Sequence, residues 1–267
     1  MRFDLIRLVL VDRPKDLFAE PQPDREQWLR EVFGKRIVFQ HRKTEMHYVP
    51  STTAHPTLVV GRIGKPTHID ENEPPEAGMG EIERESWRAA AVVIDPVKHE
   101  DGQKAAVQDR VGRPTAIFKS LVRHINEASY NPYVIEANPI VDPETFWQFE
   151  VQNRGQITSI SFDLFPPNMF GIRNELDKEM KELHGIEKVH EATLQLKNPE
   201  GLNLETERVR QTVGYTLEGG GNIRARTKTK KSYNSKNRTK RVLIEVEKRE
   251  TFLNKIGKAV TRLFTSE

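Results

Sequence analysis

The chain contains no cysteine among its 267 residues. Disulfide bonds and thiolate metal sites are therefore excluded, and a chain without cysteine suits a reducing compartment. Any metal ion would have to be bound by His, Asp or Glu side chains.

Long hydrophobic runs are also missing. No stretch approaches the roughly 18 to 20 apolar residues that a membrane span requires. The apolar run at the N-terminus is interrupted by Asp4 and Arg7 and is not followed by a small-residue cleavage site, so it does not fit a signal peptide. We therefore expect a soluble, cytoplasmic protein without a membrane partner.

Acidic residues are absent between Glu218 and Glu245, while basic residues crowd the same stretch. This basic segment contains Arg224, Arg226, Lys228, Lys230, Lys231, Lys236, Arg238, Lys240 and Arg241. Without these nine, the 42 Lys and Arg of the chain fall to 33 against 39 Asp and Glu, a net charge of −6. The excess of positive charge is therefore local. Local charge density of this kind is typical of phosphate-backbone binding, because steering and counterion release depend on it.

The hydrophobic periodicity predicts an α+β fold with mixed or antiparallel sheets and helices packed on one face. We divide the chain into two similar-sized α+β subdomains, residues 1–153 and 154–267. The first half is expected to contain helices at 24–33 and 114–125 and strands at 3–11, 36–40, 46–49, 57–63, 87–95 and 132–137. The second half is expected to contain strands at 157–165 and 189–196, helices at 174–183 and 205–217, and an amphipathic C-terminal helix.

Residues 66–85 are predicted to form an acidic loop. The stretch combines Pro74 and Pro75 with seven carboxylates, namely Asp70, Glu71, Glu73, Glu76, Glu81, Glu83 and Glu85. It buries too little apolar surface to form a packed element. We interpret it as a solvated connector or as a negatively charged flap over the basic segment.

The basic segment has the alternation of a strand. Its first strand, 222–228, turns Ile223, Ala225 and Thr227 to one face and its cations to the other. We pair this strand with 240–247 in a basic β-hairpin, 222–247. Polar side chains at its tip would donate to phosphate oxygens, and Tyr233 would stack on a base.

These features predict a non-catalytic protein that binds the phosphate backbone of nucleic acid. The expected binding residues are Arg224, Arg226, Lys228, Lys230, Lys231, Tyr233, Lys236, Arg238, Lys240 and Arg241. DNA and RNA, single- or double-stranded, are all compatible with this prediction, and the oligomeric state is left open. Two alternatives are a solvated charged tip that resists aggregation and a protein-interaction subunit that docks an acidic partner in a multicomponent assembly. The general character of the sequence is similar to that of accessory proteins of bacterial defence and mobile-element loci, so antiviral defence is an expected context.

Candidate catalytic residues are few. Asp95 ends a buried strand, Glu136 lies in another, and Asp163 occupies the middle of a third, where an unpaired charge is costly. If the three converged, they would bind Mg²⁺ for phosphodiester hydrolysis. A Mg²⁺-dependent nuclease is therefore the enzymatic alternative, and only this alternative requires a cofactor. Arg36 and His41 have the Arg-x4-His spacing of HEPN ribonucleases, but the run between them predicts a strand, whereas that family places both residues on a helix.

Overall fold

The computed structural model of the chain describes residues 1–13, 23–52, 56–97, 99, 102–165, 182–183, 189 and 191–243. Within these ranges, the chain forms four helices and twelve strands, and the strands make up two antiparallel sheets. The predicted α+β fold is therefore confirmed. None of the helices in these ranges is long and apolar enough to cross a membrane. The expected C-terminal helix and nearly all of the helix expected at 174–183 lie outside the described residues.

The first sheet has eight strands in the order β12-β1-β6-β5-β4-β3-β2, with β7 also paired to β1. Its strands are β1 (Arg2–Asp12), β2 (Ile37–His41), β3 (Thr44–Pro50), β4 (Val59–Asn72), β5 (Glu81–Asp95), β6 (Gln103–Gln108), β7 (Tyr133–Pro139) and β12 (Arg241–Leu243). Strand β1 pairs with β6 along one edge and with both β7 and β12 along the other. The strands expected at 36–40, 46–49 and 57–63 are confirmed as β2, β3 and β4, which form an antiparallel meander.

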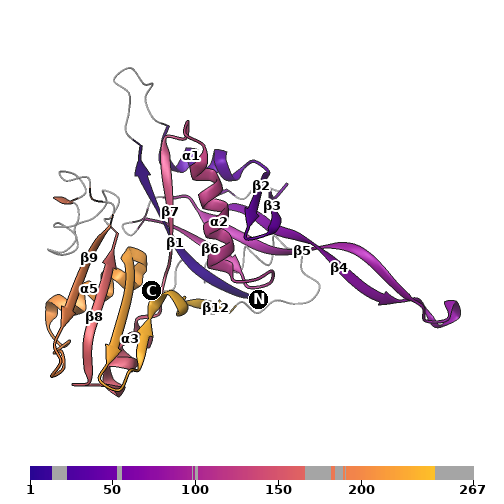
Figure 1. Cartoon of the computed structure of the whole chain (residues 1–267). Helices are drawn as coiled ribbons and strands as arrows, with labels where there is room; N and C mark the ends of the chain where they lie inside the picture. The colour runs from indigo at the N-terminus through magenta and orange to yellow at the C-terminus, as the bar shows by residue number, and fades with distance from the viewer. Residues whose placement is uncertain are drawn as a thin grey trace.

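Two helices cover one face of this sheet (Figure 1). Helix α1 (Arg25–Phe33) begins at Asp24, whose carboxylate accepts the backbone N–H groups of Glu26 and Gln27. Helix α2 (Pro114–Glu127) begins with a proline, whose missing N–H would have no partner at that position. The apolar stripes of both helices pack on the buried side chains of β1 to β7 and form the larger core.

The second sheet has four strands in the order β11-β10-β8-β9. They are β8 (Ile157–Leu164), β9 (Ala192–Lys197), β10 (Gly221–Thr227) and β11 (Ser232–Asn234). One face packs on α3 (Pro143–Gln152) and α5 (Glu207–Tyr215), which continues into a π-helical turn, η2 (Thr216–Gly220). Ile223 and Ala225 are buried on this face while Arg224 and Arg226 are exposed on the other, so the predicted alternation of β10 is confirmed.

Strands β4 and β5 continue past the body of the first sheet as a projecting two-stranded arm (Figure 1). They remain paired from Val59 opposite Ile94 to Asn72 opposite Glu81, and the short turn η1 (Pro75–Ala77) closes the tip. The prediction of an acidic loop at 66–85 is therefore wrong. These residues extend two strands whose buried ends are anchored in the core, and each strand satisfies the backbone hydrogen bonds of the other, so little side-chain burial is needed.

The basic segment does not form the hairpin expected at 222–247. Strand β10 pairs with β11 across a tight turn, in which the backbone N–H of Thr227 donates to the oxygen of Lys231 at 3.0 Å. The chain then crosses to the first sheet, where β12 pairs with β1. The second half of the chain thus supplies a strand to the first sheet, and the division into subdomains at residue 153 stays a prediction.

Candidate functional site

The cations of the basic segment are divided between two surfaces. Arg224, Arg226 and Lys230 line a cavity of about 780 Å³ on the open face of the second sheet, beside Ser159 and Lys197. Later residues of the segment line a different cavity, which lies at the N-terminal end of α2. The segment therefore does not form the single cationic surface that its sequence predicts.

Three cations of the segment are paired with acids. The Nη2 atom of Arg224 lies 2.8 Å from Oδ1 and 3.1 Å from Oδ2 of Asp163. Lys228 Nζ lies 3.9 Å from Glu200 Oε2, and Arg241 Nε lies 3.3 Å from Asp4 Oδ1. The other six, Arg226, Lys230, Lys231, Lys236, Arg238 and Lys240, form no ion pair with any residue that the structure describes. Arg224 is therefore the binding candidate whose charge is most fully compensated within the fold.

Two adjoining cavities flank the N-terminal end of α2. Their volumes are about 450 and 670 Å³, and both are lined by Gly112, Arg113 and Ala116. We call the two together the α2 groove. Six of its basic side chains, Arg42, Lys65, Arg110, Arg113, Lys119 and Lys236, have no ion-pair partner among the described residues.

The acidic residues that line the α2 groove are already engaged. The groove has two of them among the described residues, Asp4 and Asp109. Asp4 pairs with Arg241, and Asp109 Oδ2 lies 3.6 Å from Arg2 Nη1. The six cations therefore have no ion-pair partner among the groove's described acids, and an anion bound there would relieve their mutual repulsion.

Two further features affect the charge of the α2 groove. Burial lowers the pKa of Lys119, and the neighbouring charge of Lys236 lowers it further, against an opposing effect of Glu136. Helix α2 has no acidic residue in its first turn, and Arg113 at its N-cap makes no side-chain hydrogen bond to the helix. The partial positive charge at that helix end is therefore not offset locally.

His41 lies at the edge of the first cavity of the α2 groove. Its Nδ1 is 2.8 Å from Oγ of Ser120 on α2. Burial lowers the pKa of His41, and the charges of Arg42 and Lys65 lower it further, which favours the neutral ring. His41 ends the strand Ile37–His41 and Arg36 directly precedes it, so the run between them is a strand, as its sequence predicted, and not the helix of HEPN ribonucleases.

Tyr233 is not available to stack on a base. Its ring is buried, 5.4 Å from that of Phe146, and its hydroxyl lies 2.9 Å from Oγ1 of Thr145. The expectation of base stacking is corrected because β11 is an edge strand whose central side chain points into the second core. This burial could not be predicted from the sequence, because a strand of three residues with polar neighbours is too short to show a pattern of buried and exposed positions.

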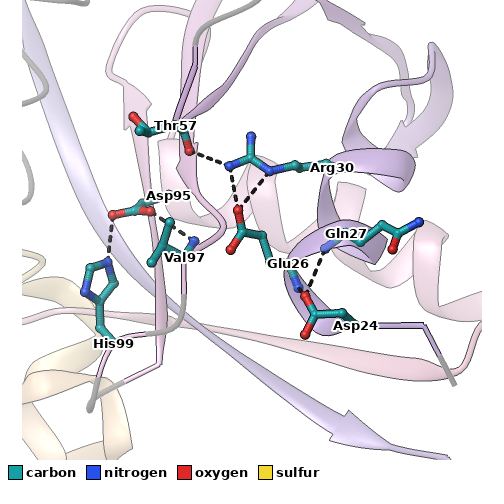
Figure 2. A network of polar contacts seen from close by, with 8 residues as sticks. All are labelled: Asp24, Glu26, Gln27, Arg30, Thr57, Asp95, Val97 and His99. Carbon is teal, nitrogen blue, oxygen red and sulfur yellow. Dashed lines mark hydrogen bonds and ion pairs between the residues drawn. The ribbon is translucent and has the colours of Figure 1, made fainter.

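The three carboxylates of the nuclease hypothesis lie on three strands in two sheets. Asp95 accepts a hydrogen bond from the backbone N–H of Val97 at 3.1 Å and lies 2.7 Å from Nε2 of His99 (Figure 2). Strands β6 and β1 lie between Asp95 and Glu136, which places their strands about 14 Å apart at the usual spacing. Asp163 belongs to the second sheet and is held by Arg224. In the described ranges, no three His, Asp or Glu side chains are grouped closely enough to hold a metal ion.

The same close-up shows how α1 is tied to the segment that precedes β4 (Figure 2). Arg30 contacts Glu26 Oε1 at 2.7 Å and donates to the backbone oxygen of Thr57 at 2.9 Å. These contacts satisfy the polar groups within the fold.

Sequence reasoning missed five of the six unpaired cations of the α2 groove. Arg42, Lys65, Arg110, Arg113 and Lys119 are spread over 78 positions, so they create no local excess of charge. They are gathered only because α2 packs against β2, Lys65 of β4 lines the same cavity, and the chain returns beside β1. Comparison of the chain with protein-family models, curated proteins and solved structures finds no match.

Proposed function

We propose that the protein binds the phosphate backbone of nucleic acid in the α2 groove, without catalysis of its own. The main supporting observation is the set of six basic side chains that line the groove without an ion-pair partner among the described residues. The two described acidic residues of the groove are already paired. A polyanion would satisfy these charges and release counterions, which is the main source of backbone affinity.

The lining of the groove favours contacts to phosphates over contacts to bases. No Phe, Trp or Tyr is among the described residues of the α2 groove, so stacking on bases has no platform there. Contacts to phosphate and sugar position a nucleic acid without reading its sequence. We therefore infer binding with little sequence preference.

A second cationic surface favours a long ligand over a mononucleotide. Arg226 and Lys230, which are unpaired within the described residues, lie with Lys197 on the open face of the second sheet. Both surfaces belong to one chain, so a polymer that contacts both gains affinity that a single phosphate group cannot. The α2 groove is the primary site because it holds more unpaired cations.

The proposal is tested by charge reversal in the groove. Fluorescence anisotropy with labelled duplex DNA and duplex RNA measures the affinity of the variant R113E/K119E. We expect its affinity to fall by roughly tenfold or more, because two phosphate contacts are lost and replaced by repulsion.

The matched control is R208E/R210E on α5. Both residues are exposed, neither lines the α2 groove, and the change in net charge is the same. The control should bind within about twofold of the wild type, since its charges lie outside the contact surface. An equal loss of affinity in both variants, or no loss in R113E/K119E, would overturn the proposal.

A further inference from the structure

The arm formed by β4 and β5 has the features of a binding surface. It projects from the body of the protein (Figure 1). Its side chains from residue 68 outward are almost all exposed. Ile69, Ile82 and Met79 are 39%, 39% and 60% exposed. A two-stranded hairpin is marginally stable alone in water, and exposed apolar side chains on it indicate a contact surface.

One face of the arm is basic at its base and acidic at its tip. Directly opposed residues of antiparallel strands share a face, so Lys65 and Arg88 share this face at the base. Ile69 and Ile82 follow on the same face together with Arg84 and Glu71, which pair with each other at 3.6 Å, and the carboxylates of Glu73 and Glu76 lie beyond them at the tip. The face continues that of Ile63, which is buried against the core that α2 covers.

The base of this face borders the α2 groove. Lys65 lines the first cavity of the groove together with Arg42 and Arg113. The paired strands hold the tip of the arm roughly 25 Å beyond Lys65, and the arm points away from the body (Figure 1). The acidic tip therefore does not reach the groove of its own chain in this conformation.

We propose that the acidic tip of the arm binds in the α2 groove of a second copy of this chain. Two arms lie antiparallel on the face described above, so that each tip reaches the base of the other arm. Glu73 and Glu76 of one copy then face Lys65, Arg42 and Arg113 of the other, and Ile69 and Ile82 lie near the centre. Because the two contacts are identical, the assembly closes as a symmetric dimer.

The dimer occupies the groove that the proposed function assigns to nucleic acid. The arm tip and a phosphate backbone compete for the same cations, so nucleic acid should dissociate the dimer. This competition rests on the proposed function, whereas the association of the two copies does not.

Sedimentation velocity of the full chain tests the association. At low ionic strength, about 50 mM, the wild type should sediment as a dimer, and at about 500 mM as a monomer, because salt screens the contact. The variant E73K/E76K should be monomeric at both. The control E81K/E85K carries the same charge change on the opposite face of the same arm, and it should remain a dimer at low salt.

Mixing charge-reversed variants separates a specific contact from a loss of folding. R42E/R113E and E73K/E76K should each be monomeric alone, and they should form a dimer when mixed, because every acidic surface then meets a basic one. A monomeric wild type at low salt, an equal effect of the control variant, or no association on mixing would overturn the inference. Nucleic-acid binding that persists in a monomeric wild type would refute the arm contact alone and leave the proposed function intact.

Discussion

Replacing Arg224 by Ala should destabilise the fold more than it weakens nucleic-acid binding. Arg224 lies in the basic segment, but its guanidinium contacts both carboxylate oxygens of Asp163, at 2.8 and 3.1 Å. The Asp163 side chain is only 7% exposed, whereas that of Arg224 is 55% exposed. The two partners therefore respond differently when the other is removed.

The exposures set the expected magnitudes. Without Arg224, the carboxylate of Asp163 stays largely out of water with its charge uncompensated, which costs about 2–3 kcal/mol. Without Asp163, the guanidinium can turn to water, so Asp163→Ala should cost about 1 kcal/mol or less. The double variant should resemble Asp163→Ala, because the penalty of losing Arg224 exists only while the carboxylate is present.

Urea denaturation of the wild type, both single variants and the double variant measures these free energies of unfolding. The comparison requires that the free energy of unfolding falls with urea concentration with the same slope in all four proteins. Anisotropy with duplex DNA should show that Arg224→Ala binds nearly as well as the wild type. A smaller loss of stability in Arg224→Ala than in Asp163→Ala, or a loss of affinity as large as that of a groove variant, would refute this reasoning.

Three further predictions concern single side chains. Burial raises the pKa of Asp4 above 3.8, so its ionisation opposes folding, and wild-type stability relative to Asp4→Asn should fall as pH rises from about 4 to 7 in urea titrations. Tyr233→Phe should cost about 1 kcal/mol, for one hydrogen bond, without changing nucleic-acid affinity in anisotropy, whereas lost affinity would favour base stacking. Burial, Arg42 and Lys65 hold the pKa of His41 below 6.5, so affinity should rise as pH falls through that lowered pKa, and His41→Gln should abolish the rise.

Local patterns predicted the elements whose partners are close in sequence or whose faces differ sharply in polarity. The alternation of Ile223 and Ala225 with Arg224 and Arg226 identified β10 and both of its faces. The apolar stripe behind Pro114 identified α2, which the structure places at 114–127. In both cases one face of the element is buried, and this burial appears in the sequence as a regular spacing of apolar residues.

The remaining features depend on pairings between distant parts of the chain. Strand β12 is three residues long and pairs with β1, more than 230 positions away, so no local pattern reveals it. The arm is charged on both faces, and its strands are fixed by backbone pairing rather than by an apolar face. The cations of the α2 groove are single residues that only the fold brings together, which is why the sequence pointed to the basic segment alone.

The salt dependence of duplex DNA binding tests the central claim most directly. If the six unpaired cations of the α2 groove contact phosphates, the logarithm of the affinity should fall with the logarithm of the salt concentration with a slope of about −5. Replacing Lys119 and Lys236 by Ala should reduce the magnitude of that slope by about 2. A slope near zero, or one that this double variant leaves unchanged, would contradict binding of the phosphate backbone in the groove.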